Sequence, residues 1–358
     1  MDRARPKVLD QGDTRESNWV GRFAQWTERH YLLMDVIATI VLIALFDSAT
    51  YGDLQMIGNA PYSPSRVPTI TLTIIMLSPL AFRRRFPEGS ALAMAVLAYA
   101  ENIDDPSVLA PVITLIANKH ASVGIRAEHY PIVGKHLLAS IREVLGDAAS
   151  DELIHAWGVA YGALADVFIE AESKLYNEAC NSDGGWSGWR SFRIIDKVRE
   201  SAEITSFHLV PCDGGPLPSY RAGQYTTVRA FVPELGVMQL RQYTLSIAPG
   251  AMHFRISVKR EPASTTTPAG RVSNRLHDFY KVGDMLELAP PFGEFFLDET
   301  HDGPVVLISG GVGITPMMAM IDRLVAAAPS RPVQFVHACR NAEVFAFGAH
   351  LAKVAERH

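Results

Sequence analysis

The sequence contains few cysteines. Cys180, Cys212 and Cys339 are scattered along 358 residues and form no C-x-x-C pair. An odd number of widely spaced cysteines supports neither a disulfide framework nor a zinc or iron–sulfur site. We therefore expect three ordinary thiols in a reducing compartment.

The chain also lacks an excess of positive charge. Its formal net charge is −5 at pH 7, with 33 lysines and arginines against 38 acidic residues. This balance argues against a nucleic-acid partner held by a basic face. The length allows two or three domains. The hydrophobic fraction of 48% is high for a purely soluble enzyme, and one N-terminal segment accounts for it.

That segment contains two apolar runs, residues 31–46 and 67–82. Each run is slightly shorter than the roughly 20 residues of a membrane-spanning helix. Residues 83–85 are three arginines that end the second run, and further arginines precede the first. Because cations flank both outer ends, we predict a transmembrane helical hairpin that tethers the rest of the chain, on the cytoplasmic side, to the inner or plasma membrane. A pair of buried helices in a soluble protein is the alternative.

A helical pattern follows the apolar runs. Apolar residues recur at three- and four-residue spacing and predict helices over residues 89–101, 107–121, 130–145 and 150–176. His120 lies near the end of the second of these helices. A histidine there can bind iron through Nε2 if a second group, such as Tyr130 or Glu172, holds the other ring nitrogen. On composition alone, an ordinary surface or core histidine is the more common case.

From residue 192 to about residue 297 the pattern alternates and is interrupted by glycine and proline, which predicts a small antiparallel β-barrel. One predicted strand carries the string Arg241-Gln242-Tyr243-Thr244. There Arg241 can neutralise a flavin pyrophosphate, the ring of Tyr243 can stack on the flavin, and the Thr244 hydroxyl can reach flavin N5. Ordinary strand packing is the alternative for any one of these side chains.

Two further segments indicate phosphate binding at helix N-termini. Gly270–Asn274 begins a short predicted helix whose N-terminus could take a flavin phosphate. The string Gly310-Gly311-Val312-Gly313-Ile314-Thr315-Pro316 follows a predicted buried strand and opens a helix over 315–328. Its glycines let backbone N–H groups approach a dinucleotide phosphate. With a strand over 332–338 and a last helix near 343–356, this predicts a truncated α/β NAD(P)-binding domain.

These strings, in this order, resemble the bacterial flavohaemoglobins. The resemblance to the later globin helices rests on Ile-Ala-Asn-Lys-His-Ala-Ser at 116–122, Tyr-Pro-Ile-Val-Gly at 130–134 and Ala-Tyr-Gly at 160–162. It continues through the flavin and nicotinamide motifs and covers about three quarters of the chain. It implies a nitric oxide dioxygenase that contains haem b and FAD, uses NAD(P)H, and converts nitric oxide and O2 to nitrate. No protein partner can be inferred.

The resemblance also assigns roles to residues. His120 matches the proximal haem ligand, Tyr130 and Glu172 match the catalytic pair that hydrogen-bonds around it, and Lys119 matches a residue at the haem edge. The residues that would contact FAD or the nicotinamide nucleotide are Tyr225, Arg241, Gln242, Tyr243, Thr244, Gly270, Val272, Ser273, Gly311, Val312, Gly313, Ile314, Thr315 and Pro316.

The chain departs from the family in its first part. Residues 79–87 loosely resemble the membrane region of actinobacterial sensor histidine kinases, and the front globin helices have no counterpart. We therefore predict a polar tail and membrane hairpin (1–87), a partial all-α globin (88–180), a ferredoxin-reductase-like FAD barrel (187–300) and the truncated NAD(P) domain (303–358). Besides the dioxygenase, two hypotheses remain: a haem-less, membrane-tethered flavin reductase, or an inactive chimeric product.

Overall fold

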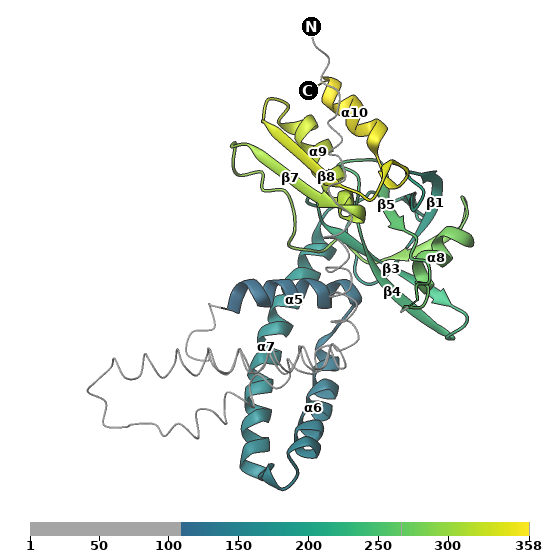
Figure 1. The fold of residues 1–358 in the computed structure, drawn as a ribbon. Helices are drawn as coiled ribbons and strands as arrows, with labels where there is room; N and C mark the ends of the chain where they lie inside the picture. Colours follow the sequence, from purple (N-terminus) through teal and green to yellow (C-terminus); the bar gives the residue numbers. More distant parts are fainter. Residues whose placement is uncertain (1–108, 266, 358) are drawn as a thin grey trace, which may run out of the picture. The chain divides into compact units, whose positions relative to one another are not determined.

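The computed structural model describes residues 109–265 and 267–357. The predicted membrane hairpin and the first part of the predicted globin lie outside the described residues. Within them, three helices come first, six antiparallel strands with one short helix follow, and a parallel strand pair with two helices ends the chain (Figure 1).

The helical part consists of α5 (Ala110–Val123), α6 (Tyr130–Leu145) and α7 (Asp151–Asn181). Pro131 in the first turn of α6 favours a helix start there. N–H groups in a first turn have no acceptor within the helix, so proline, which has no N–H, loses no hydrogen bond. Ser150 caps α7 by accepting a hydrogen bond from the Leu153 amide at 3.2 Å. The predicted limits of α6 are confirmed, and α7 runs five residues further than predicted, to Asn181 rather than residue 176.

One face of α7 packs against α5 and α6. Its buried residues recur at helical spacing: Tyr161, Leu164, Ala165, Phe168 and Glu172. By length and composition alone, α7 is the one described helix that could cross a membrane. However, its buried tyrosine and glutamate are hydrogen-bonded to the neighbouring helices.

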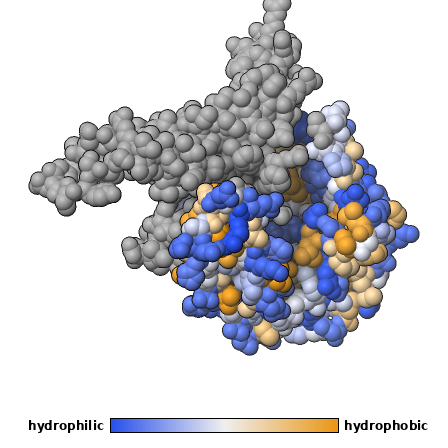
Figure 2. All heavy atoms as spheres, turned by 90° about the horizontal axis from the view of Figure 1, so that it is seen from below, coloured by the Kyte–Doolittle hydropathy of each residue, from blue (hydrophilic) through white to orange (hydrophobic). Residues whose placement is uncertain are grey.

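The helices also leave large apolar side chains exposed, including Val112, Ile132, Val133 and Val159. On the face of the molecule drawn in Figure 2, hydrophobic residues form patches between hydrophilic ones. Exposed apolar side chains of this kind are common on folded proteins and do not by themselves define a site.

The middle part is a six-stranded sheet with the order β4-β3-β6-β1-β2-β5. All neighbouring pairs are antiparallel, which confirms the predicted antiparallel sheet. The end strands meet after β4, where Leu245 forms an isolated bridge with Ile256 of β5. The elements are β1 (Arg190–Arg199), β2 (Ile204–Pro211), β3 (Tyr225–Val232), β4 (Val237–Thr244), β5 (Phe254–Lys259), α8 (Arg271–Asp278) and β6 (Met285–Leu288).

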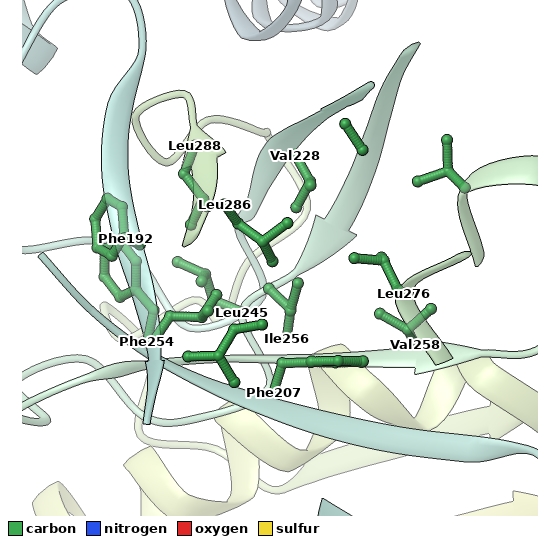
Figure 3. Close-up of a cluster of buried hydrophobic side chains, with 14 of the residues drawn as sticks. Phe192, Phe207, Val228, Leu245, Phe254, Ile256, Val258, Leu276, Leu286 and Leu288 are labelled. Carbon is green, nitrogen blue, oxygen red and sulfur yellow. The ribbon is translucent and has the colours of Figure 1, made fainter. Parts of the chain in front are cut away.

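A continuous apolar core is formed by side chains of this sheet and of α8 (Figure 3). Phe192 and Phe254 stack with ring centroids 5.5 Å apart and are almost fully buried. Alternate residues of β3, such as Val228 and Ala230, point into the core, as expected where one face of a strand is buried. Leu276 of α8 closes one end of the core, so this helix is held at the edge of the sheet.

The last part pairs β7 (Val305–Gly310) in parallel with β8 (Val333–Ala338), and α9 (Ile314–Ala327) connects them. This confirms the predicted strand–helix–strand unit. The predicted last helix near 343–356 is confirmed as α10 (Gly348–Arg357), but it begins five residues later than predicted and a 3₁₀ turn (Ala342–Val344) precedes it. Between them Phe347 takes φ of 59° and is buried, and a left-handed residue cannot continue a helix.

The contact between α6 and α7 gives a testable prediction. A Cβ on Gly134 would lie 2.6 Å from Cε1 of the buried Tyr161 ring, so Gly134→Ala should destabilise the protein by about 1–3 kcal/mol. Gly162→Ala is the matched control, because a Cβ there has no neighbour within 4 Å and alanine favours a helix. Thermal unfolding followed by circular dichroism should show a lower midpoint for the first variant only. Equal midpoints for the two variants would contradict this packing.

Candidate functional site

Three helices bring His120, Tyr130 and Glu172 together. His120 is in the last turn of α5, Tyr130 is the first residue of α6, and Glu172 is on the buried face of α7. Nδ1 of His120 lies 2.7 Å from Glu172 Oε1 and 3.2 Å from the Tyr130 hydroxyl. The Tyr130 hydroxyl also donates a short hydrogen bond to the same carboxylate oxygen. The structure therefore places three predicted residues within one hydrogen-bonded group.

Burial determines the protonation of the tyrosine. Glu172 is only 2% exposed and Tyr130 8%. Burial, followed by the hydrogen bond to Glu172, raises the pKa of the Tyr130 hydroxyl well above its usual range. The phenol therefore stays protonated and remains a donor to the carboxylate. The Tyr130 hydroxyl and the Glu172 carboxylate, which both lie near Nδ1 of His120, are thus hydrogen-bonded to each other.

This arrangement fits a histidine that binds a haem iron. A proton on Nδ1 can be donated to Glu172, which leaves the lone pair on Nε2. No described residue hydrogen-bonds Nε2, and the side chain of His120 is 34% exposed. Within residues 109–265 and 267–357 there is no group of three or more histidine, cysteine or acidic side chains that could hold a metal ion. A single histidine suits haem because the porphyrin supplies the four equatorial ligands.

Other residues of α7 support the group, and the sequence analysis missed them. The Tyr161 hydroxyl donates to the Tyr130 carbonyl at 2.7 Å, and the Phe168 ring lies 5.6 Å from that of His120. The Tyr176 hydroxyl donates to the Ile125 carbonyl at 2.5 Å, just beyond the end of α5. Their spacing along one helical face is the signal that could have found them.

Helix α5 is also hydrogen-bonded to the sheet. The Asn118 side chain accepts from the Gly293 amide at 2.8 Å. The Gln242 amide donates to the Ser122 hydroxyl at 2.7 Å, and that hydroxyl donates to the Lys119 carbonyl. Gln242 was predicted to contact a cofactor, but its side-chain amide is engaged by α5. The Lys119 side chain is exposed, and no described residue hydrogen-bonds or ion-pairs its ammonium group.

Tyr225, predicted to contact the flavin, starts β3 beside this contact. Its ring packs against Gly293, where an added Cβ would lie 2.8 Å from Tyr225 Cε1. Gly293 also has φ of 118°, so both its conformation and its surroundings require glycine. Tyr225 therefore lies between the sheet and the segment that contacts α5.

The three remaining predicted motifs line one cavity of about 480 Å³. It is formed by the end of β4, the start of α8 and the glycine turn before α9. The predicted residues that line it are Arg241, Gln242, Tyr243, Thr244, Gly270, Val272, Ser273, Val312, Gly313, Thr315 and Pro316. Gly311 lines a neighbouring cavity, whereas the fully buried side chain of Ile314 belongs to the core beneath the turn.

The lining of this cavity fits a flavin dinucleotide. The Arg241 guanidinium has only uncharged described partners, Gln239 and the Leu240 carbonyl, so its charge is free to meet a phosphate. Burial raises the pKa of Tyr243 to about 12, so this ring stays neutral beside the cavity. A Cβ on Gly270 would lie 2.6 Å from Ser273 Oγ, so a larger residue where α8 begins would displace the Ser273 side chain.

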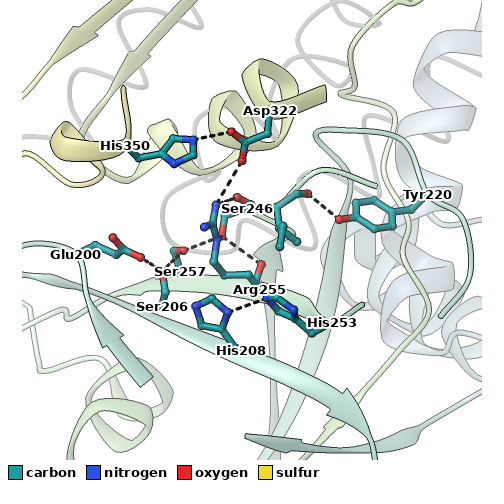
Figure 4. A network of polar contacts seen from close by, with 11 residues as sticks. Glu200, Ser206, His208, Tyr220, Ser246, His253, Arg255, Ser257, Asp322 and His350 are labelled. Atoms are coloured by element: carbon teal, nitrogen blue, oxygen red, sulfur yellow. Dashed lines mark hydrogen bonds and ion pairs between the residues drawn. The ribbon is translucent and has the colours of Figure 1, made fainter. Parts of the chain in front are cut away.

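A polar network joins the sheet to α9 and α10 (Figure 4). Arg255 of β5 lies 4.0 Å from Asp322 of α9, and Asp322 is 2.6 Å from Nε2 of His350 in α10. Behind it, His208 and His253 are 2.8 Å apart, and burial lowers the pKa of both imidazoles. The network holds α9, and with it the glycine turn, against the flavin strands. The sequence offered no local signal for these pairs, because they join separate elements.

Comparisons with protein families match both ends of this architecture. A globin family model matches residues 82–168, and an oxidoreductase NAD-binding domain matches residues 307–358. A domain of unknown function, DUF7134, matches residues 23–118 and overlaps the start of the globin match.

Comparisons with whole proteins cover more of the chain. A flavohemoprotein of Chromobacterium violaceum is 59% identical over 271 residues, which is 76% of this chain and 67% of that protein. One of Rhizobium meliloti is 51% identical over 279 residues, 78% of this chain and 69% of that protein. A flavohemoglobin from Malassezia yamatoensis, solved with bound FAD and heme, is 25% identical with a TM-score of 0.66, covering 91% of this chain and 80% of that one. From these similarities and the arrangement of its residues, the chain belongs to the flavohemoprotein family.

Proposed function

We propose that this chain acts as a flavohaemoglobin-type nitric oxide dioxygenase, converting nitric oxide and O2 to nitrate with electrons from NAD(P)H. The observation that carries the proposal is Nε2 of His120, which no described residue hydrogen-bonds, on a helix that is hydrogen-bonded to the Gln242 side chain of β4. When bound, haem, FAD and NAD(P)H supply oxygen chemistry, single-electron transfer and hydride donation.

The residues around His120 set the properties of the proximal ligand. The buried Glu172 carboxylate accepts from Nδ1 and makes the imidazole more basic at Nε2. The Tyr130 hydroxyl donates a hydrogen bond to that carboxylate and holds it in position. A more basic His120 would donate more electron density to a haem iron held at Nε2.

The residues of the cavity orient the flavin and the nucleotide. Arg241 offers positive charge to a pyrophosphate, and the Thr244 hydroxyl lies at the end of the same strand, within the cavity. The turn Gly311–Gly313 precedes α9, and backbone N–H groups at this helix N-terminus would hold the pyrophosphate of the nicotinamide nucleotide. Asn118 and Ser122 accept hydrogen bonds from the Gly293 backbone amide and the Gln242 side chain, and these bonds hold α5 beside the strand that lines this cavity.

The second candidate function is a haem-less NAD(P)H:flavin reductase. It is favoured because the lining of the flavin and nucleotide cavity includes described residues of β4, α8 and the glycine turn, whereas the described helices supply the haem with its proximal side only. An inactive chimeric product is the third candidate. It is favoured by the overlap of two unrelated family matches at residues 82–118.

Three finer features belong to the same proposal. The bridge between Leu245 and Ile256 supports closure of the sheet into a barrel. The apolar runs and flanking arginines of residues 31–82 support a membrane tether with the enzyme domains in the cytoplasm. The domain limits 1–87, 88–180, 187–300 and 303–358 stay predictions.

His120→Ala should abolish the haem spectrum and leave the flavin spectrum unchanged, because only the proximal ligand is removed. His136→Ala, an exposed histidine on α6, is the matched control and should keep both spectra. The measurement is the absorption spectrum of purified protein before and after dithionite and carbon monoxide. Haem retained by His120→Ala would refute the ligand assignment. Flavin bands without haem in the unaltered protein would favour the reductase. A spectrum with neither flavin nor haem bands would favour the inactive product.

Glu172→Gln should weaken the proximal ligand, because an uncharged amide accepts from Nδ1 less strongly than a carboxylate does. We expect a lower iron–histidine stretching frequency in the resonance Raman spectrum of the ferrous protein. Nitric oxide turnover should fall about 10–100-fold, as is typical when an outer partner of a metal ligand is changed. An unchanged stretching frequency would show that the carboxylate does not act through His120.

Arg241→Ala combined with Thr244→Ala should weaken FAD binding about tenfold or more, because a hydrogen bond to a charged group contributes about 1.5–3 kcal/mol. Met238→Ala serves as the control, since this side chain is exposed on the same strand and lines no part of the cavity. Flavin content is measured from absorbance after gel filtration. Wild-type flavin content in the double variant would show that the flavin lies elsewhere.

A further inference from the structure

A second cavity lies at the carboxyl ends of the parallel strands β7 and β8. It has a volume of about 530 Å³, and its lining includes Gly311, Cys339 and Arg340. In folds of this type the pyrophosphate lies at the glycine turn, and the adenosine ribose lies at the end of the next strand. An acidic residue at that second position binds the ribose 2′-hydroxyl of NAD, whereas an arginine accommodates the 2′-phosphate of NADP.

The acidic residue of this cavity comes from elsewhere in the chain. Residues 339–341, which follow β8, are Cys-Arg-Asn and contain no carboxylate. Glu203, from the turn between β1 and β2, lines the cavity instead, and its Oε1 forms a close ion pair with Arg340 Nη2. The turn is fixed by backbone hydrogen bonds from Ala202 N to Glu343 O at 2.9 Å and from Arg260 N to Glu203 O at 2.8 Å.

Both cations of the cavity are already paired. Arg340 is engaged by Glu203, and the ammonium of Lys259 lies 2.9 Å from Glu261 Oε1. A 2′-phosphate carries a charge of about −1.5 to −2 at pH 7, and Glu203 would repel it. A 2′-hydroxyl, by contrast, can donate a hydrogen bond to the same carboxylate.

We infer that Glu203 is a specificity-determining residue that makes this chain select NADH over NADPH, by engaging Arg340 and receiving the ribose hydroxyl. The inference rests on the nucleotide site of the proposed function. It adds a residue that precedes the glycine turn and belongs to the flavin sheet rather than to the nucleotide domain.

The test is isothermal titration of the full chain with ADP-ribose and with 2′-phospho-ADP-ribose. The unaltered protein should prefer ADP-ribose by about tenfold or more, and Glu203→Gln should reduce that preference about tenfold, since a factor of ten needs only about 1.4 kcal/mol. Glu299→Gln is the matched control. It breaks a similar ion pair, with Arg323 at 2.7 Å, away from the cavity, and should leave the preference unchanged. Arg340→Ala added to Glu203→Gln should remove the gained affinity for the 2′-phosphate.

Several outcomes would overturn the inference. Equal affinity of the unaltered protein for both ligands excludes selection, and an equal loss of both affinities in Glu203→Gln assigns this side chain a purely structural role. Binding of neither ligand by the unaltered protein removes the nucleotide site itself, and with it both the inference and the proposed electron source. The flavin spectrum, recorded for every variant, separates these results from a failure to fold.

Discussion

The helical part of this protein depends on one buried carboxylate. Glu172 is almost fully enclosed, and a charge in such a place requires partners that compensate for the lost hydration. Tyr130 and the Nδ1 atom of His120 are those partners, and they come from the two other helices. These hydrogen bonds therefore join α5, α6 and α7 at one point. Nε2 of the imidazole has no hydrogen-bond partner among the described residues.

The same helix that carries the imidazole is aligned with the flavin strands. Asn118 and Ser122, on the buried face of α5, meet a backbone amide and the Gln242 side chain of the sheet. Side-chain hydrogen bonds on this short helix face therefore connect the helix of His120 to the antiparallel sheet. Gln242 thus links β4 to α5. Its position in the sequence, between Arg241 and Tyr243, did not indicate this role.

Electrostatics organise the nucleotide side in a different way. Its cations are not left free for phosphates, because Glu203 and Glu261 already pair with Arg340 and Lys259. In the inferred NADH site, backbone N–H groups at the start of α9 would bind the pyrophosphate. The polar network around Arg255 keeps this helix in place against the sheet.

Local pattern determined much of this protein from the sequence alone. Helix α6, the strand–turn–helix around Gly311 and the flavin string of β4 follow from periodicity, proline, glycine and residue order. The resemblance to flavohaemoglobins supplied the roles of His120 and its two partners. Tertiary structure decided the rest, because non-local packing outweighs local preference. The buried Phe347, in a left-handed conformation, makes the last helix begin later than the local pattern predicts. Glu203 forms an ion pair with Arg340, 137 residues later in the chain, and no spacing in the sequence indicates this contact.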